Sequence, residues 1–450
     1  MTIKVRFAPS PTGLLHIGNA RAALINWLFV RSHQLQGQDA HFLLRQDDTD
    51  LERSKDEFAE AIKQDLAWLG VTHDSFFKQS ERFVRYDEIK QQLIDSGRLY
   101  PCYETPEELD FKRKRQMGRG EPPIYDRGAL KLTADEIAAY EAEGRRPHWR
   151  FKLLPEDIKW ADLIRGETSF HGANLSDPVL VRADGAYLYT LTSVVDDVDT
   201  NITHILRGED HVTNTAVQIQ LFEALGRDSK TIHFGHTTLL MDVDGSPLSK
   251  RLGSLSLRSL RDMGIEPMSI NCLLARLGTS QPVEAKYSLD ELAAGFDLST
   301  FSRTPPRFDM SDLENLNRKI YQVWPYAALQ HKLKDLKAEG ISEQIWNLIK
   351  GNISTLDELT QWQQVFFGDI SNSADDKDYL AIALTLLPSE PWTIETWSNW
   401  TGAIKAKTGR KGRELFMPLR QALTGFDHGP EMKEILPLLG EDLVRKRLGE

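Results

Sequence analysis

The stretch "RFAPSPTGLLHIGNARAALINWLF", residues 6–29, decides the fold. A short apolar strand over 5–8 enters a turn broken by proline and glycine, and a helix with Leu24 and Leu28 at helical spacing follows directly. A strand, a turn and a helix in close succession are typical of a sheet with parallel strands. The start of such a helix is an anion site, and His16 can donate a hydrogen bond to a phosphate oxygen there. An ordinary turn with a capping histidine is the alternative.

Two common phosphate-binding signatures are absent from this turn. It has neither the G-x-x-x-x-G-K-[ST] pattern nor the G-x-G-x-x-G pattern. Gly13 and Gly18 would still let the backbone approach a ligand closely. The residues therefore suit the phosphates of a nucleotide, bound in another way.

Composition places the chain among ordinary globular proteins. Its 450 residues predict two to four domains, and 40% are hydrophobic and 27% charged. Two cysteines, Cys102 and Cys272, make no disulfide framework, so we expect a cytosolic protein. The first residues lack an apolar core of signal-peptide length. No run approaches about 18 apolar residues, and we expect no membrane span.

The net charge of −11 argues against a general nucleic-acid coat protein. It does not exclude an enzyme that acts on nucleic acid, because local patches matter more than the sum. Basic residues gather in "FKRKRQMGRG", residues 111–120, and in "IKAKTGRKGRELFMPLR", residues 404–420. A solvated basic face is the alternative for each.

The order of elements predicts the architecture. Strand and helix patterns alternate over 1–100 and again from 186 to about 245, and nearly everything after about 255 is helix-compatible. Between the two alternating parts, prolines interrupt the pattern, a helix begins with a Thr133–Glu136 capping box, and β-like segments cover 148–153 and 177–191. We expect an α/β fold: a Rossmann-like, doubly wound parallel catalytic domain, split by an α+β insertion and followed by all-α domains. Such a sheet binds its ligand outside the carboxyl ends of its strands.

A second feature follows the last α/β strand. "DGSPLSKRLGS", residues 244–254, holds Ser249, Lys250 and Arg251 between glycines. A mobile loop with a lysine can close over phosphates and balance the charge that develops in phosphoryl or nucleotidyl transfer. A solvated basic turn is the alternative for this loop taken alone.

The two stretches together resemble the paired HIGH and KMSKS motifs of class I aminoacyl-tRNA synthetases, with "HIGN" at 16–19 and "PLSKR" at 247–251. "LTSVVDDVDTNITHILRGEDH", residues 191–211, and "GRELFMPLRQALTG", residues 412–425, are similar to the glutamyl-tRNA synthetases specifically. The resemblance runs from residue 3 to the C-terminus and is weakest across roughly 325–400.

The resemblance implies a two-step reaction. Glutamate and ATP form glutamyl-adenylate and pyrophosphate, and the glutamyl group then passes to the 3′-terminal adenosine of tRNA. Because no covalent enzyme intermediate forms, alignment and charge stabilisation carry the catalysis. The expected partners are L-glutamate, ATP, Mg²⁺ on the pyrophosphate, and tRNA-Glu, with tRNA-Gln left open. The expected state is a cytoplasmic monomer.

The resemblance also implies site residues. His16, Asn19 and Lys250 would be catalytic, and Arg6 with Tyr189 would bind the substrate's side-chain carboxylate, where an arginine favours glutamate over glutamine. A surface salt bridge is the alternative for Arg6. The wider expected sites are His16, Gly18, Glu209, Ser249, Lys250 and Arg251 for ATP, and Arg6, Ser10, Asp47, Tyr189, Ser193 and Arg207 for glutamate.

Three residues depart from the family pattern. Asp47 stands where glutamate is usual and keeps the charge for the substrate ammonium with one methylene less. Ser193 stands where asparagine is common and reaches less far. Pro247 replaces a lysine and removes one cation from the loop, while Lys250 remains. Each departure bears on rate or substrate fit more than on the type of reaction.

A metal site in the chain itself is not expected. Some family members hold a structural zinc in the insertion with cysteines and histidine, but no second cysteine follows Cys102 within 160 residues. A cysteine-based tetrahedral site cannot be assembled, and we predict no zinc. "DVDG", residues 242–245, lacks the remaining ligands of a calcium loop. The acidic clusters 47–50 and 196–199 are interpreted as turn and substrate-side carboxylates.

The resemblance divides the chain into five parts with expected roles. These are the first half of the catalytic domain (1–100), an insertion that handles the acceptor end of tRNA (101–185), the second half with the KMSKS-like loop (186–254), a stem-contact helical region (255–320) and a helical anticodon-binding domain (321–450). The basic run at 112–115 is a candidate phosphate contact in the insertion.

Three rival functions stay open from the sequence. An enzyme that glutamylates a base within tRNA would lack the anticodon domain that the C-terminal helices indicate. A small-molecule nucleotidyltransferase shares the HIGH-type turn but has no need of 200 trailing helical residues. An inactive tRNA-binding paralogue draws support from the three departures, whereas the intact His16, Arg6, Arg207 and Lys250 argue against it.

Overall fold

The computed structural model describes residues 2–248, 256–370 and 376–449. These residues form two compact units. The first comprises 1–262 and 270–309, and the second comprises 263–269 and 310–450. Each unit is described by itself.

The described strands are short and lie mostly in the first half of the chain. They are β1 Ile3–Phe7, β2 Ala40–Gln46, β3 Ser75–Lys78, β4 Leu99–Cys102, β5 His148–Phe151, β6 Asp157–Asp162, β7 Gly166–His171, β8 Val179–Val181, β9 His204–Gly208, β10 His233–Thr237, β11 Met241–Asp242 and β12 Arg307–Phe308.

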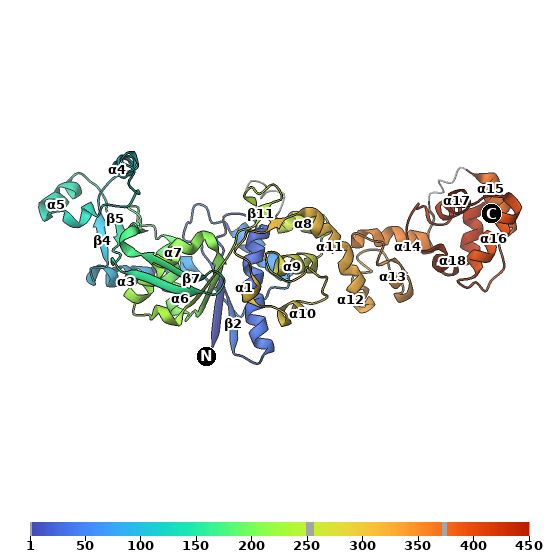
Figure 1. Cartoon of the computed structure of the whole chain (residues 1–450), viewed down its shortest axis with the longest axis horizontal. Coiled ribbons are helices and arrows are strands. Elements are labelled where there is room, and N and C mark those ends of the chain that lie inside the picture. The colour runs from blue at the N-terminus through green and yellow to red at the C-terminus, as the bar shows by residue number, and fades with distance from the viewer. Residues whose placement is uncertain (1, 249–255, 371–375, 450) are drawn as a thin grey trace. The chain divides into compact units, whose positions relative to one another are not determined.

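The described helices occur along the whole chain (Figure 1). They are α1 Ile17–Leu35, α2 Asp56–Trp68, α3 Phe83–Asp95, α4 Pro106–Gly118, α5 Ala134–Ala142, α6 Tyr189–Asp199, α7 Val212–Ala224, α8 Leu257–Asp262, α9 Pro267–Arg276, α10 Leu289–Ala294, α11 Met310–Val323, α12 Tyr326–Gln330, α13 Glu343–Ile349, α14 Leu359–Phe367, α15 Lys377–Thr385, α16 Thr396–Thr408, α17 Arg413–Thr424, α18 Met432–Leu439 and α19 Glu441–Leu448. None of them is long and apolar enough to cross a membrane.

The first unit is built on two parallel pieces of sheet that meet edge to edge. β1, β2 and β3 pair in that order, and β9 pairs with β10. β1 contacts β9, and the backbone N–H of Thr203 donates to the carbonyl of Lys4 at 3.0 Å. Two halves from distant parts of the chain therefore meet between β1 and β9, which is the switch point of a doubly wound fold. The predicted Rossmann-like catalytic domain is confirmed.

The strand–turn–helix at the start of the chain forms as its pattern predicts. α1 buries Ile17, Leu24 and Leu28 completely against the first sheet, and it contacts β1, β2 and β9. Because α1 spans the junction of the two pieces, its N-terminus lies where β1 and β9 end. The turn over 8–16 is thereby placed at the carboxyl edge of the strands.

The insertion has its own antiparallel strands. β4, β5 and β8 form one small sheet, and β6 and β7 form a hairpin. The capping box at the start of α5 is confirmed, since Thr133 N–H donates to Glu136 Oε2 at 2.8 Å and Glu136 N–H donates to Thr133 Oγ1 at 3.3 Å. The insertion is thus an α+β element, as expected.

The β-like pattern over 177–191 was only partly right. The strand ends at Val181, and the chain turns through Asp184 and Gly185. It pairs once more at Tyr187 and begins α6 at Tyr189. The alternation of large apolar residues persists through the turn because Tyr187 and Leu191 both enter the core, so sequence alone could not show where the strand stops.

The second unit is helical in its described part. Its core includes Trp346, Trp400 and Tyr379, which are fully or almost fully buried. The indole N–H of Trp400 donates to the carbonyl of Ala383 at 2.9 Å, so a large amphipathic ring is accommodated without an unpaired donor. The predicted helical C-terminal region is confirmed for these residues.

Candidate active site

A cavity of about 910 Å³ opens at the carboxyl ends of β1 and β9. Its walls come from the turn after β1, the start of α1, the loop after β9 and residues 237–240 after β10. Eight of the predicted site residues line it: Arg6, Ser10, His16, Gly18, Asn19, Asp47, Tyr189 and Arg207. The cavity therefore lies at the switch point of the sheet, where the sequence predicts a ligand site.

His16 is both the cap of α1 and a wall of the cavity. Its Nδ1 accepts hydrogen bonds from the N–H groups of Gly18 and Asn19 at 3.1 and 3.4 Å, and Asn19 Oδ1 accepts from the backbone N–H of His16 at 3.4 Å. Burial lowers the pKa of His16, so the ring is neutral at pH 7. With Nδ1 accepting, the proton lies on Nε2, which is then a donor for a ligand oxygen. The capping and ligand-binding interpretations are thus compatible.

Gly18 is needed for this arrangement. A Cβ atom at this position would lie 3.0 Å from Cε1 and 3.1 Å from Nδ1 of His16. A side chain would therefore press on the imidazole that caps the helix. Gly18 makes room for the histidine, in addition to any close approach of a ligand.

Arg6 is held from one side only. Its Nε donates to Oδ1 and Oδ2 of Asp197 at 3.1 and 3.2 Å, and the side chain is 4% exposed. Among the described residues no acceptor takes the four hydrogens on its two Nη atoms. A guanidinium in this state offers its planar fork to a carboxylate in the cavity that it lines. The surface salt bridge that we considered is instead a buried one.

Arg207 is held from several sides. Nη1 donates to Tyr189 Oη at 3.0 Å, and Nη2 donates to Thr215 Oγ1 and Gln218 Oε1, both at 2.6 Å. Nε donates to His236 Nε2 at 3.4 Å. Burial lowers the pKa of Arg207 from its usual value, but not far enough to discharge a guanidinium at neutral pH. Arg6 and Arg207 therefore place two fixed cations at one cavity.

Asp47 faces these cations from β2's end. Its Oδ1 and Oδ2 accept from Nε and Nη2 of Arg45 at 2.6 and 3.1 Å. Burial raises the pKa of Asp47 to about 6, against the opposing effect of Arg45. Asp47 also lines the cavity, and each carboxylate oxygen keeps a second lone pair beside its bond from Arg45, so the carboxylate can still attract a cationic group of a ligand.

The acidic cluster 196–199 corrects a prediction. These residues lie in α6, not in a turn, and Asp196 and Asp197 are buried. Asp196 accepts from Arg82 Nε at 2.7 Å and from Gln79 Nε2 at 2.6 Å, and Arg45 Nη1 donates to Asp197 at 2.9 Å. These carboxylates face arginines of the protein because the polar face of α6 packs on them. They support the site from behind.

Ser193 and Glu209 lie outside the cavity lining. Ser193 is fully buried, and its Oγ accepts from Gln218 Nε2 at 2.9 Å, which places it behind Arg207. Glu209 accepts from Arg165 Nη1 at 2.5 Å, although its neighbours Gly208 and Asp210 do line the cavity. The structure brings these two predicted residues near the site without putting them in its wall.

The lysine loop falls outside the described residues. Ser249, Lys250 and Arg251 belong to 249–255. Ser256, the next described residue, pairs with His16 through an isolated bridge and lines the cavity. The chain after the loop therefore returns to the site.

Sequence reasoning missed several lining residues. Arg21, on α1, donates to the carbonyls of Thr238 and Leu277 at 2.6 and 3.0 Å, and burial lowers its pKa to about 10. The ring of His211 lies against that of Tyr189 in a tilted arrangement, with centroids 5.5 Å apart. Arg21 lies three residues after Gly18, so helical spacing from Gly18 could have suggested it, whereas only the path of the chain after β9 places His211.

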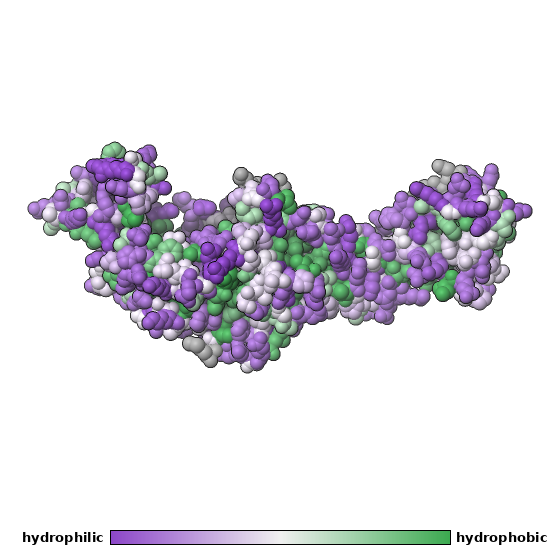
Figure 2. Space-filling model, in the orientation of Figure 1, coloured by the Kyte–Doolittle hydropathy of each residue, from purple (hydrophilic) through white to green (hydrophobic). Residues whose placement is uncertain are grey.

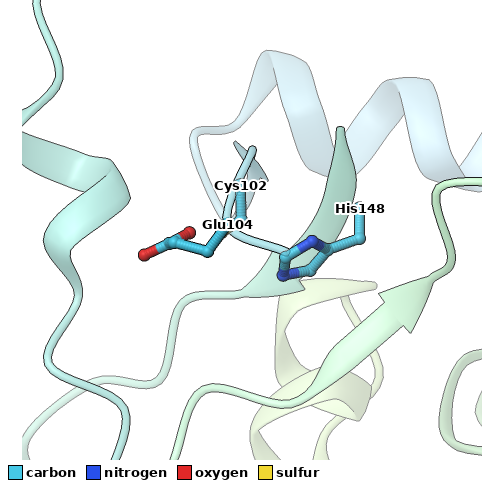
Figure 3. A group of neighbouring side chains, drawn as sticks. All are labelled: Cys102, Glu104 and His148. Atoms are coloured by element: carbon cyan, nitrogen blue, oxygen red, sulfur yellow. The ribbon is translucent and has the colours of Figure 1, made fainter. Parts of the chain in front are cut away.

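Three side chains of the insertion that could hold a metal also come together. Cys102 and His148 are register partners on β4 and β5, and Glu104 follows β4 (Figure 3). One ligand atom from each lies within 4.8 Å of the others. Counting cysteines alone missed this group, because a carboxylate and an imidazole also bind zinc.

The surroundings of this group do not suit zinc. Glu104 Oε1 accepts from Lys112 Nζ at 3.1 Å, and Arg150 Nε donates to His148 Nε2 at 3.3 Å, so two cations already stand there. Burial raises the pKa of Cys102 to about 12, so this residue is a neutral thiol in the metal-free chain. Glu104 Oε2 is buried without a partner among the described residues and could bind a cation. The positive charges of Lys112 and Arg150 nevertheless oppose the binding of a second cation there. The prediction of no zinc stays a prediction, now with this support.

Comparisons with known families cover almost the whole chain. Residues 2–315 match the family described as "tRNA synthetases class I (E and Q), catalytic domain". Residues 319–450 match the family described as "Anticodon binding domain". The first match contains the cavity, and the second covers nearly all of the helical unit.

Similar proteins match at full length. A "Glutamate--tRNA ligase 2" of Methylorubrum populi is 53% identical over 445 residues, with 99% of this chain and 98% of the relative covered. A "Glutamate--tRNA ligase" of Azospirillum brasilense is 52% identical over 449 residues, with 100% and 99% covered. A crystal structure of a glutamate tRNA ligase from Elizabethkingia meningosepticum in complex with its amino acid has a TM-score of 0.83 at 26% identity, and the match covers 100% of this chain and 98% of that one.

Proposed function

Since this chain belongs to the glutamate–tRNA ligases, a group of class I aminoacyl-tRNA synthetases, we propose that the cavity at the ends of β1 and β9 binds glutamate and ATP side by side. Enzymes of this group use ATP to join glutamate to tRNA. Two alternatives, an enzyme that glutamylates a base within tRNA and an inactive tRNA-binding paralogue, are less well supported. An anticodon-binding match covers 319–450, and Arg6 and Arg207 both line the cavity.

The state of Arg6 is the observation that carries the proposal. A buried arginine that faces a cavity and whose four Nη hydrogens have no acceptor among the described residues can bind a carboxylate through two parallel hydrogen bonds. The glutamate side chain is then bound by Arg6 beside Tyr189, its α-carboxylate by Arg207, and its ammonium by Asp47. Glutamine, which has an amide in place of the outer carboxylate, would leave the Arg6 charge unpaired.

ATP occupies the His16 side of the cavity in this proposal. The N-terminus of α1, the Nε2 donor of His16 and the open backbone at Gly18 suit phosphate oxygens. Lys250 supplies the charge that stabilises the departing pyrophosphate. Of the described lining residues Asp47 and Asp210 carry carboxylates, and this proposal assigns Asp47 to the substrate ammonium. Mg²⁺ would be held mainly by the phosphates of ATP, and Asp210 is the candidate protein carboxylate for it.

The insertion is proposed to bind the acceptor end of tRNA. A cavity of about 490 Å³ beside α4 has five cationic side chains in its wall: Lys112, Arg113, Arg115, Arg119 and Arg150. Figure 2 shows strongly hydrophilic residues gathered over α4. Phosphate contacts at such a patch position RNA without reading its sequence, and they make the affinity depend on salt.

The helical unit is proposed to bind the anticodon. A cavity of about 400 Å³ near α16, α17 and α18 has Trp397 and Phe416 in its wall together with Arg413 and Arg420. Phe416 is 43% exposed although it is aromatic. Aromatic faces beside arginines suit an unstacked base and its phosphate. The five domain boundaries expected from the sequence remain proposals, as do the monomeric state and the cytoplasmic location.

Charging with labelled glutamate, using purified tRNA-Glu and tRNA-Gln side by side, tests the function. We expect tRNA-Glu to be charged with glutamate and not with glutamine. Charging of tRNA-Gln as well would mean that a second enzyme must amidate the product. Charging of neither tRNA would contradict the proposal.

A further inference from the structure

Asp162 of the insertion reaches a histidine behind the proposed glutamate site. Asp162 is the last residue of β6, and His236 lies on β10, in the second piece of the catalytic sheet. Asp162 Oδ2 lies 2.5 Å from His236 Nδ1, and Oδ1 accepts from the backbone N–H of His236 at 3.1 Å. Both side chains are fully buried. A carboxylate of the insertion is thus built into the catalytic sheet.

This contact determines which nitrogen of His236 carries the proton. An ionised Asp162 only accepts, so Nδ1 must be the donor and Nε2 must be the acceptor in the neutral ring. On the other side of the ring, Nε2 lies 3.4 Å from Arg207 Nε and 2.9 Å from Thr215 Oγ1. Only a bare Nε2 can accept from Arg207, because Arg207 has no lone pair to offer in return.

The hydrogen-bond inventory of Arg207 shows what this acceptor does. A guanidinium has five N–H hydrogens. Nη2 gives both of its hydrogens to Thr215 and Gln218, Nη1 gives one to Tyr189, and Nε gives its own to His236. Among the described residues this leaves one Nη1 hydrogen, on a side chain that lines the cavity. The four protein partners therefore fix where the fifth hydrogen points.

Asp162 is itself rigidly placed. Its Oδ1 also accepts from the backbone N–H groups of Ile164 and Arg165 at 3.1 and 3.0 Å. Burial alone would raise the pKa of Asp162, but the bonds from His236 and from the backbone outweigh it and lower the pKa to about 2. Burial lowers the pKa of His236. The pair is therefore a carboxylate and a neutral imidazole at pH 7 and above.

We propose that Asp162 and His236 are positioning residues for the amino-acid site: Asp162 selects the tautomer of His236 whose Nε2 accepts from Arg207, and Arg207 is thereby aimed at the substrate. This inference rests on the proposed role of Arg207 in binding glutamate. The insertion would then contribute to glutamate binding as well as to tRNA binding, since Asp162 on its strand β6 holds His236 behind Arg207. The strand register brings His236 beside Arg207, because these two residues are direct partners on β10 and β9.

Asp162→Asn is the sharpest variant. The amide oxygen can keep the three backbone bonds now made by Oδ1, while the amide nitrogen replaces Oδ2 and offers a donor to Nδ1. The amide nitrogen also ends the longer bond that Oδ2 accepts from Trp160 Nε1 at 3.3 Å. His236 must then carry its proton on Nε2, where it opposes Arg207 Nε. We expect the KM for glutamate to rise about tenfold or more, since a hydrogen bond to a charged group is lost, with the KM values for ATP and tRNA within about twofold of the wild type.

His236→Asn and His236→Gln separate the two ends of the imidazole. Asparagine can still donate to Asp162 but has no acceptor for Arg207, whereas the oxygen of glutamine can occupy the place of Nε2. We expect His236→Gln to restore the KM for glutamate toward the wild type and His236→Asn not to. Proton NMR gives a second readout: the downfield Nδ1–H signal of His236 should be present in the wild type and absent from Asp162→Asn.

The same hairpin provides a matched control. Asp157, at the other end of β6, accepts from Nδ1 of His171 at 2.9 Å, but this pair is exposed. Asp157→Asn makes the same chemical change on the same strand and should leave all KM values unchanged. Equal rises in every KM for Asp162→Asn, or equal effects of the two His236 variants, would overturn the inference. Failure of the wild type to charge tRNA would instead overturn the proposed function.

Discussion

Arg6 and Asp197 are joined along one edge of the guanidinium. Nε of Arg6 lies 3.1 Å from Oδ1 and 3.2 Å from Oδ2 of Asp197, and Asp197 also accepts from Nη1 of Arg45. One buried carboxylate thus aligns the arginine that faces the cavity and is itself fixed by a second arginine. Within the described part of the chain, Nε of Arg6 is held by Asp197 while its Nη atoms have no partner, and this arrangement preorganises the guanidinium to bind a carboxylate.

Arg6→Ala tests the substrate pocket. We expect the kcat/KM for glutamate to fall roughly a hundredfold, because a bidentate bond between two charges is lost. Discrimination against glutamine, measured as the ratio of adenylate formation with each amino acid, should shrink at the same time. Arg6→Lys keeps the charge without the fork and should give an intermediate value. An unchanged KM for glutamate would remove Arg6 from the pocket.

Lys250→Ala tests the loop after the last strand of the catalytic domain. Pyrophosphate exchange should slow by roughly a hundred- to a thousandfold, since charge stabilisation in the transition state is lost. The affinity for tRNA, measured by filter binding, should stay almost the same. A parallel loss of tRNA binding would mean that the lysine has a structural role.

Asp47 predicts a pH dependence for glutamate binding. Burial raises the pKa of Asp47 to about 6, so the carboxylate becomes protonated as the pH falls through that value. Only the ionised form attracts the substrate ammonium, and kcat/KM for glutamate should rise from pH 5 to about 7 and then level off. Asp47→Asn should lower kcat/KM and flatten this profile. Persistence of the same profile in the variant would assign the titration to another group.

The same shift bears on stability with the opposite sign. A carboxyl group whose pKa is higher in the folded state than in the unfolded state binds protons more tightly when folded. Its contribution to stability therefore falls as the pH rises from about 4 to about 6, and is constant above that. The melting temperature of Asp47→Asn should accordingly be less sensitive to pH over this window than that of the wild type.

Variants of Asp196 and Asp199 test whether the acidic cluster 196–199 stabilises the fold or binds substrate. Asp196 is completely buried among Gln79, Arg82 and Tyr86, so Asp196→Ala should cost roughly 3–5 kcal/mol and lower the melting temperature of the first unit by several degrees. Asp199 pairs with Arg82 and Arg85 at the surface, and Asp199→Ala should cost under about 1 kcal/mol. A large rise in the KM for glutamate with unchanged stability in Asp196→Ala would restore the substrate-side interpretation.

Chelation tests the side-chain group around Cys102. With Lys112 and Arg150 already placed beside Glu104 and His148, the purified protein should contain well under one zinc per chain. Treatment with a zinc chelator should leave both the charging rate and the melting temperature unchanged. One zinc per chain, lost together with thermal stability, would show that these residues do hold the metal.

Much of the fold could be predicted because the local spacing of apolar residues indicates which segments are strands and which are helices. The strand and helix at 3–35 follow from apolar residues at alternate positions, a proline- and glycine-rich turn and helical spacing, and each of these is a property of neighbouring residues. The exception was the segment after β8, where Tyr187 and Leu191 kept an alternating pattern through a turn into α6. Periodicity reports burial, and burial continued while the type of element changed.

The sequence by itself indicated which residues to expect at the site: the turn around His16 and Lys250 for the nucleotide, and Arg6 for the carboxylate of glutamate. Only the tertiary structure decided their partners. Arg6 meets Asp197 from 191 residues away, and His236 meets Asp162 from 74 residues away, while Ser193 and Glu209 stand back from the cavity wall. Strand order and register bring such pairs together, and neither is encoded in the spacing of residues along one segment.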